Sequence, residues 1–350
     1  MTALVDAHVL RTLPKVELHC HLEGSIRAST LVQLADLRGI ALPTRDPVAL
    51  YAFDDLAEFL AVYEVACSAV VSASDFALIT YESLEDAVRT SNVVYREMFF
   101  NPSLHPGVPY ETMLDGILDG LRAARRDFGI TTALIPSIYR QLPVDTALEM
   151  LDVVIAHRTD EVVGIGMDGD ELRDPPERFT EVYARAASAG LHRTAHVAHD
   201  GPANFIVTCL DQLGCERVDH GYHVIDDPAL MQRLADERVP FMCATPTPPL
   251  CGWPASFDAS PVRTMIDAGL TVVLNSDDPT MLGTDLGTEF DRVCTRWSLP
   301  PERVRRLVTD ALDAAWLDDA DRTRLAGQIV PELDRLLGTT PPAERLRVES

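Results

Sequence analysis

The chain has 350 residues, of which 47% are hydrophobic and 24% are charged, a composition typical of a folded globular protein. Its 30 basic and 54 acidic side chains give a formal net charge of −24, which argues against nucleic acids and anionic membranes as partners, because both need clustered positive charge. The length suits two average domains or one large barrel, and no linker or low-complexity stretch divides it.

The cysteines and the first residues indicate where the protein works. Seven cysteines are an odd number and none forms a CxxC pair, so neither a disulfide framework nor a thiolate zinc site is predicted. Asp6 and His8 interrupt the start of the chain, where a signal peptide needs an unbroken apolar core. No apolar run is long enough to span a membrane. We therefore expect a soluble, cytoplasmic protein.

Short apolar runs rich in β-branched residues recur along the chain, as expected of strands buried on both faces. They cover residues 16–20, 93–99, 131–138, 162–167, 193–197, 217–220, 240–243 and 271–275. Helix-like stretches separate them, among them 110–128, 144–157, 176–189, 203–213 and 229–236. Alternating strands and helices indicate a parallel sheet, and eight repeats favour an α/β fold of the (β/α)8 TIM-barrel type over a doubly wound sheet. The prediction is a single barrel domain over residues 1–350.

Two segments exceed what the barrel needs. Residues 30–89 are too many for one crossover, so they are predicted to form a helical insertion after strand one that acts as a lid. Residues 300–350 are predicted to form C-terminal helices that close the far side of the barrel.

Histidine and aspartate follow several of the predicted strands. His19 and His21 are two residues apart and so share one face of an extended chain, whereas Cys20 points away. His196, His220 and the Asp277–Asp278 pair end three further strands. Each feature alone has an ordinary explanation, since an Asp-Asp-Pro turn is usually a helix cap and a strand-terminal His is usually a core residue. Together, at the strand ends where TIM barrels carry their chemistry, they predict a divalent metal site, with zinc as the favoured ion and iron or manganese as alternatives.

A metal at this rim indicates hydrolysis. A bound divalent ion lowers the pKa of its water to about 7, and a neighbouring His or Asp can accept the proton. The spacing of the residues leaves open whether the attacked atom belongs to an amide, a phosphate ester or an amino-heterocycle.

Four motifs resemble the adenosine/adenine deaminase family of the metal-dependent amidohydrolase superfamily, over about residues 12–335. They are PKVELHCHLEGS at 14–25, VGIGMDGDE at 163–171, DHGYH at 219–223 and LNSDDP at 274–279. The Leu-Glu-Gly form of the first motif, and EMFFNP at 97–102 with His105, resemble the bacterial adenine deaminase branch more.

The resemblance implies a role for each matching residue. It implies that zinc is held by His19, His21, His196 and Asp277. It implies that His220 orients and deprotonates the zinc water, and that Asp278 and the backbone of Gly169 hold purine ring nitrogens. Glu23 takes the place of an acidic residue that meets the ribose in nucleoside-specific members. The expected partner is a small amino-heterocycle, bound by a monomer or a homo-oligomer.

One position departs from the family. The family has His-Ala-Gly-Glu after strand five, and that Glu hands a proton to the purine ring, whereas this chain reads HVAHDGP at 196–202 and places His199 there. His199 is interpreted as the acid for an altered substrate, as an inert pocket residue with Asp200 or Glu171 taking the proton, or as the mark of a weakened or repurposed barrel. The first interpretation predicts low activity on ordinary adenosine or adenine. The stretch CATPTPPL at 243–250 also departs from the family pattern.

Three functions follow from these residues. The first is a zinc-dependent aminohydrolase that removes an amino group from a purine-like base or nucleoside, ordinary or modified, by attack of zinc-bound hydroxide. The second is a metal-dependent hydrolase of another cyclic amide or amidine. The third is a purine-binding relative with little or no catalysis.

Overall fold

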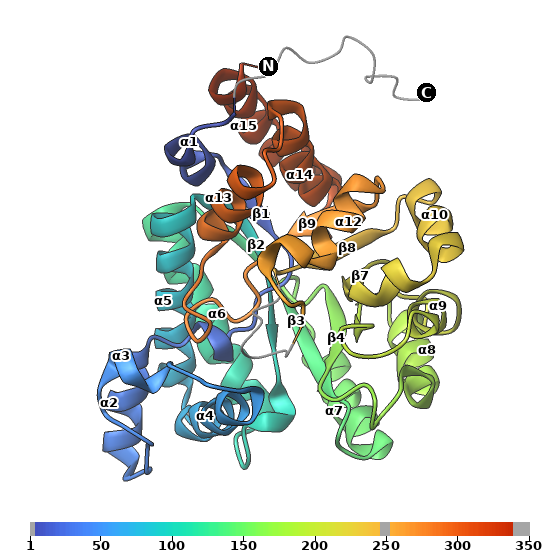
Figure 1. Ribbon diagram of the computed structural model, residues 1–350. Coiled ribbons are helices and arrows are strands. Elements are labelled where there is room, and N and C mark those ends of the chain that lie inside the picture. The colour runs from blue at the N-terminus through green and yellow to red at the C-terminus, as the bar shows by residue number, and fades with distance from the viewer. Residues whose placement is uncertain (1–3, 246–252, 339–350) are drawn as a thin grey trace.

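The computed structural model describes residues 4–245 and 253–338. Short parallel strands surround a central axis, and helices pack around them (Figure 1). The strands are β1 (Lys15–Glu17), β2 (Val93–Phe100), β3 (Thr131–Tyr139), β4 (Gly164–Asp168), β5 (His192–Arg193), β6 (His196–Val197), β7 (Val218–His220), β8 (Pro240–Cys243) and β9 (Thr271–Leu274). All eight predicted strands are therefore present, with the fifth divided into β5 and β6.

The strands form two parallel arcs, β1-β2-β3-β4-β5 and β6-β7-β8-β9. The fifth predicted strand joins them, because Thr194 N–H donates to Ile165 of β4 at 3.1 Å, while Ala195 accepts from Asp219 of β7 at 3.0 Å. The ring closes between the first and last strands, where Cys20 bridges Asp277 and His21 N–H donates to Asp277 O at 2.8 Å. The (β/α)8 barrel is thus confirmed. Its closure brings the first predicted metal motif, around His21, next to the last one, around Asp277.

The strand and helix bounds differ from the prediction at a few ends. The helices are α1 (Ala7–Thr12), α2 (Ala28–Arg38), α3 (Pro47–Leu50), α4 (Leu56–Ala69), α5 (Ala73–Ser91), α6 (Tyr110–Phe128), α7 (Val144–Ala156), α8 (Thr180–Ser188), α9 (Asn204–Val207), α10 (Pro228–Asp236), α12 (Pro261–Asp267), α13 (Leu286–Arg296), α14 (Pro301–Ala314) and α15 (Asp319–Leu337). The helix predicted at 176–189 begins as a 3₁₀ turn, and the one at 203–213 ends as a π-helical turn. Strand one ends at Glu17 rather than at residue 20, so both histidines lie just past it.

The segment predicted as an insertion contains four helices, of which the last belongs to the outer ring. α5 packs along α6, and the contact depends on glycine: a Cβ on Gly116 would lie 2.2 Å from the Ala73 carbonyl oxygen. α2, α3 and α4 form the addition to the barrel, and in Figure 1 they lie at the end opposite α1 and α13–α15.

Buried charges and the C-terminal helices close the amino-terminal end of the barrel. Glu97 of β2 pairs with Arg217 across the interior at 2.6 Å and accepts from Trp316 N–H, which follows α14, at 2.6 Å. Lys15, the only lysine in the sequence, donates to the Arg11, Leu13 and Ser91 carbonyls at 2.8–2.9 Å. Its amine therefore ties α1 to the end of α5 rather than serving the metal motif beside it. Residues 339–350 of the predicted C-terminal region lie outside the described part.

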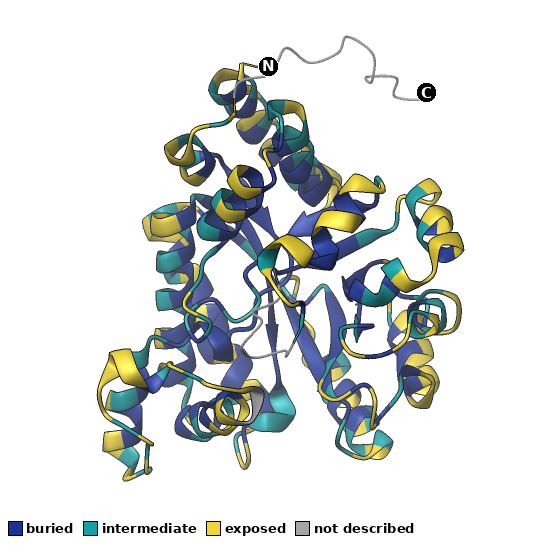
Figure 2. Ribbon diagram, in the orientation of Figure 1, coloured by how far each residue is buried: buried dark blue, intermediate teal, exposed yellow. Residues whose placement is uncertain are grey.

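The barrel strands are buried while the outer helix faces are exposed (Figure 2). Among the described residues, every helix falls short of the length and apolar character needed to cross a bilayer.

Candidate active site

The site lies at the carboxyl-terminal ends of the strands, where backbone geometry turns successive side chains toward one point. In a regular strand, neighbouring side chains point to opposite faces. His220 (φ 69°) and Asp277 (φ 62°) adopt the left-handed region, which is costly for residues other than glycine. The regular alternation stops there, so that Asp219 and His220 both face the site, as do Asp277 and Asp278.

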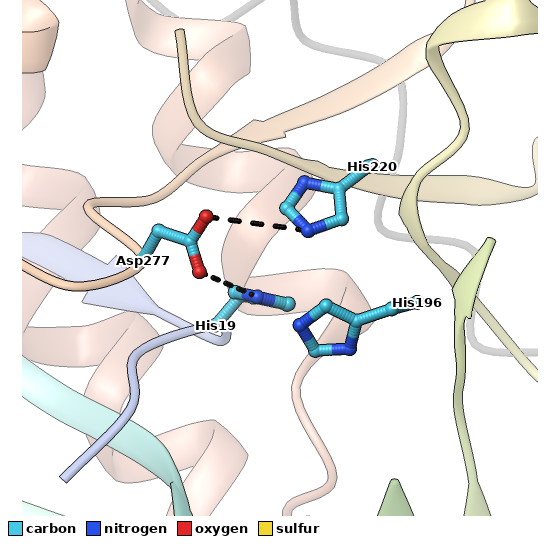
Figure 3. A group of neighbouring side chains, drawn as sticks. All are labelled: His19, His196, His220 and Asp277. Atoms are coloured by element: carbon cyan, nitrogen blue, oxygen red, sulfur yellow. Dashed lines mark hydrogen bonds and ion pairs between the residues drawn. The ribbon is translucent and has the colours of Figure 1, made fainter. Parts of the chain in front are cut away.

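Three imidazoles and one carboxylate bring their ligand atoms close together. His19 Nε2 lies 3.1 Å and His21 Nε2 3.4 Å from Asp277 Oδ1, and His21 Nε2 lies 3.0 Å from His196 Nε2. His220 stands farther out, with its Nε2 4.0 Å from Asp277 Oδ2. Figure 3 shows His19, His196 and His220 converging on Asp277 from three separate strand ends.

These separations fit a tetrahedral zinc ion. Ligands about 2.0–2.1 Å from zinc lie about 3.3 Å from one another in a tetrahedral arrangement. The side chains of His19, His196, His220 and Asp277 also offer ligand atoms within 4.8 Å of one another. The donor set of imidazole and carboxylate suits zinc and, less selectively, iron or manganese. The three predicted histidine ligands therefore lie around Asp277, but the group within 4.8 Å contains His220 in place of His21. The His21 ligand atom groups with those of Asp277 and Asp278 instead.

Asp219, which was not among the predicted site residues, lies beside two of the imidazoles and is within bonding distance of His19. Its fully buried carboxylate lies 3.1 Å from His19 Nδ1 and 3.8 Å from His196 Nδ1, and it accepts from Thr194 Oγ1 at 2.8 Å. A carboxylate on Nδ1 directs Nε2 toward the metal position, as is usual for metal-ligating histidines. The signal in the sequence was a charged residue inside an otherwise apolar strand, which needs a partner when buried.

Carboxylates and imidazoles alter one another's protonation in this cluster. Burial alone would lower the pKa of His19, but the Asp219 and Asp277 carboxylates outweigh it and raise that pKa to about 9. For His220, burial dominates and lowers the pKa to about 3. The lowered pKa favours the neutral form of His220, and the raised pKa favours the protonated form of His19.

Hydrogen bonds set the tautomer of His220. Tyr222 Oη donates to the Ala244 carbonyl at 2.5 Å, so the same oxygen accepts from His220 Nδ1–H at 3.1 Å. Neutral His220 then carries its lone pair on Nε2, the nitrogen that faces Asp277. This is the arrangement that a proton acceptor beside the metal position needs.

The position of the Asp278 carboxylate requires a glycine at residue 24. A Cβ at Gly24 would lie 1.8 Å from Asp278 Oδ1, a buried oxygen that has no hydrogen-bond partner among the described residues. Burial raises the pKa of Asp278 to about 7; His21 opposes that rise and Asp277 adds to it. Asp278 lines the central cavity, which suits it to accept from or donate to a ring nitrogen.

The loop after β6 places His199 beside an acidic partner. His199 Nδ1 lies 2.9 Å from Asp200 Oδ2, and its ring centroid lies 5.0 Å from that of His220. Burial would raise the pKa of Asp200, but the bonds from His199 and Trp253 outweigh it and hold that pKa at about 2. Glu171, which also lines the cavity, accepts from the N–H groups of residues 198, 200 and 201 at 2.6–2.8 Å, so its carboxylate holds the loop.

A cavity of about 500 Å³ opens over the cluster of histidines and aspartates, within the size range of small-molecule sites. Its inner wall includes His21, His196, His220, Asp277 and Asp278, and its outer wall includes Phe59, Leu60, Tyr63 and Glu64 of α4. Gly169 lines it too, with φ 95°, a conformation that glycine adopts without strain. The altered stretch at 243–250 lies largely outside the described residues, since residues 246–252 are not described.

Glu23 lies behind the cavity wall. Its side chain is fully buried, with Oε1 3.1 Å from His105 Nε2 and accepting from Asn101 N–H at 2.9 Å. Oε2 is buried without a hydrogen-bond partner among the described residues. Asn101 Nδ2 donates in turn to Asp168, a cavity-lining carboxylate outside the predicted set, at 2.9 Å. Glu23 is therefore linked to the cavity indirectly, through Asn101 and Asp168.

Known proteins resemble the chain over nearly its whole length. The sequence model named Adenosine deaminase matches residues 14–331. An adenine deaminase of Cupriavidus necator is 36% identical over 329 residues, which cover 92% of this chain and 93% of the relative. The crystal structure of an adenine deaminase from Arthrobacter aurescens has a TM-score of 0.86 at 32% identity and covers 93% of this chain and 100% of its own. That of an amidohydrolase from Burkholderia ambifaria with bound Zn has a TM-score of 0.88 at 34% identity and covers 95% and 94%.

Proposed function

Since the chain belongs to the adenosine deaminase family, we propose that it is a zinc-dependent aminohydrolase that releases ammonia from a purine-like base. Metal-dependent deamination of purine-like bases is the activity that the relatives and the fold support. Zinc as the metal, and the role of each residue, are the proposed part. The assembled ligand atoms of His19, His21, His196 and Asp277 are the observation that carries the proposal.

Zinc is favoured by the donor set and by the relative from Burkholderia ambifaria, which binds Zn. His19, His21, His196 and Asp277 would hold the ion, and Asp219 would keep His19 in the required tautomer. When bound, zinc would lower the pKa of a water to about 7 and so provide a nucleophile at neutral pH.

His220 is the residue proposed to accept the nucleophile's proton. Its neutral state and the lone pair on Nε2 follow from burial and from Tyr222 on the opposite nitrogen. Asp278 and the Gly169 backbone would hold the ring nitrogens of the substrate. A positioned general base of this kind contributes about 10²–10⁴-fold to the rate.

The buried position of Glu23 favours a base over a nucleoside. A carboxylate bonded to His105 and Asn101 behind the wall is not placed to accept directly from a ribose hydroxyl. In this proposal Glu23 acts indirectly, through Asn101, on the cavity-lining Asp168, and α4 serves as the lid over a small heterocycle.

The test is zinc analysis together with an ammonia-release screen of metal-loaded protein over purine bases, nucleosides and other amino-heterocycles. We expect about one zinc per chain and turnover of at least one amino-purine. His199→Glu measured in parallel shows whether position 199 sets the substrate, because it restores the carboxylate that the family carries there. Products without ammonia would identify a hydrolase of another cyclic amide or amidine, and tight binding without any product would identify a purine-binding relative.

A further inference from the structure

The loop after β6 carries a carboxylate–imidazole pair at the position where the family has a single carboxylate. His199 Nδ1 lies 2.9 Å from Asp200 Oδ2, and Asp200 Oδ1 accepts Trp253 Nε1–H at 3.0 Å. Both His199 and Asp200 line the cavity. We propose that Asp200 is a positioning residue for the deamination, holding the His199 imidazole in one orientation and one tautomer against the substrate ring. The proposal rests on the proposed function.

The backbone of this loop keeps the two side chains together. Ala198 adopts the left-handed region (φ 51°), a strained conformation for a residue with a Cβ. Glu171 offsets that strain by accepting three N–H groups of the loop, from residues 198, 200 and 201. The backbone that carries the pair is therefore fixed, and the Asp200 side chain, which is about half exposed, is anchored by Trp253 as well as by His199.

Aromatic rings limit the motion of the imidazole. The His199 ring makes edge-to-face contacts with His220, Tyr222 and Trp253, with centroid separations of 5.0, 5.3 and 5.8 Å. Rotation about χ2 would break the bond to Asp200 and these contacts together. These contacts favour the observed placement of His199, directly beside the residue proposed to accept the nucleophile's proton.

The chemical reason for the carboxylate is control of the two ring nitrogens. An imidazole is donor at one nitrogen and acceptor at the other, and its partner decides which is which. A carboxylate can only accept at physiological pH, so Asp200 assigns the hydrogen to Nδ1. An amide at position 200 can donate or accept and no longer makes this assignment. Orienting partners of this kind typically contribute about 10–100-fold when they act on a functional imidazole.

The experiment compares Asp200→Asn in two backgrounds of the zinc-loaded protein, wild type and His199→Glu, on the amino-purine that the screen finds best. We expect kcat to fall about 10–100-fold in the wild-type background and to change by no more than about twofold when His199 is absent. Trp253→Phe, which removes the donor to Asp200 and keeps a ring, is expected to lower kcat in the same direction by less. Equal losses in both backgrounds would overturn the proposal.

Asp226→Asn is the matched control. Asp226 Oδ2 lies 2.6 Å from His223 Nδ1 in an exposed pair of the same type, outside the cavity lining. This variant is expected to keep the kcat and melting temperature of the wild type. A loss of kcat in Asp226→Asn equal to that in Asp200→Asn would mean that any such pair on this rim has the effect, and would overturn the assignment to Asp200.

A readout independent of turnover separates this proposal from the proposed function. Nitrogen-15 NMR of the histidine rings in zinc-loaded protein should show His199 protonated at Nδ1 in the wild type and altered in Asp200→Asn, but unaltered in Asp226→Asn. Identical His199 resonances in all three would overturn the pairing. Wild-type protein that releases no ammonia from any compound would overturn the proposed function, and the NMR comparison would still decide the pairing.

Discussion

The two ends of the barrel interior both contain charged side chains, and their partners differ. At the amino-terminal end Glu97 pairs with Arg217 at 2.6 Å, and the Arg217 guanidinium stacks on Trp316 at 3.6 Å. At the carboxyl-terminal end His21 and His196 place two ring nitrogens 3.0 Å apart. At the first end the Glu97–Arg217 pair matches opposite charges and Lys15 is held by three carbonyls, whereas the second end brings several electron-pair donors together.

The difference shows what each end requires from outside the chain. Opposite charges in contact compensate one another, so the Glu97–Arg217 pair needs no ion from solution. Converging donors need a proton or a metal ion between them, and they are held there by left-handed residues such as His220 and Asp277. The charges at the amino-terminal end therefore stabilise the folded barrel. Those at the carboxyl-terminal end cost some folding free energy and are arranged to bind a ligand.

Loss of a ligand at the carboxyl-terminal end should have the largest effect. Asp277→Ala removes the carboxylate that lies within 3.4 Å of both His19 Nε2 and His21 Nε2. We expect bound zinc to fall from about one ion per chain to a trace, and ammonia release to fall to background. Elemental analysis and an ammonia assay check this. Ammonia release that persists without zinc would refute the metal mechanism.

Loss of a charge at the amino-terminal end should lower the stability of the fold and leave zinc binding unchanged. Glu97→Gln leaves the buried Arg217 guanidinium without its partner, which costs about 3–5 kcal/mol of unfolding free energy. Zinc content per folded chain should stay at the wild-type value. Urea unfolding and elemental analysis measure the two quantities, and loss of zinc without loss of stability would contradict the division between the ends.

Asp219→Asn tests whether a buried carboxylate that is not itself a proposed ligand supports metal binding, since Asp219 is buried just below the ligands. Its carboxylate holds His19 Nδ1 at 3.1 Å, and an amide no longer assigns the hydrogen to that nitrogen. We expect zinc affinity to weaken about 10–100-fold with the fold retained. Competition with a chelator gives the affinity. An unchanged affinity would make Asp219 a packing residue.

The smallest effect expected is in the pH dependence of the metal-free protein. Burial lowers the pKa values of His19 and His21, but nearby carboxylates outweigh it and raise them from 6.5 to about 9 and about 10. Folded-state values above the unfolded value give stability that is complete below pH 6.5 and is lost as the pH rises through 9 to 10. Zinc binding strengthens over the same range, because it needs unprotonated ligands. The difference in melting temperature between loaded and metal-free protein should therefore widen from about pH 6 to about pH 9, and a constant difference would count against this account.

Much of this could be predicted from sequence because it is local or periodic. Apolar β-branched runs such as residues 131–138 indicated the strands, and α6 has the bounds predicted for it. The two-residue spacing of His19 and His21 indicated a metal motif, because it places both imidazoles on one face of an extended chain. Asp219 and Asp168 were missed, since a carboxylate in a strand gives no sign of which imidazole or amide it will meet.

Residue types and their order along the chain were enough to determine the barrel, the candidate ligands and the small-molecule character of the partner. Ring closure between β1 and β9 decided that His21 and Asp277, more than 250 residues apart, meet within 3.4 Å. Tertiary packing also placed Glu23 behind the cavity wall and directed the Glu171 carboxylate to backbone N–H groups. It brought Asp200 within hydrogen-bond distance of His199. The physical reason is that a side chain's protonation and direction depend on its neighbours in space, and those neighbours come from distant parts of the sequence.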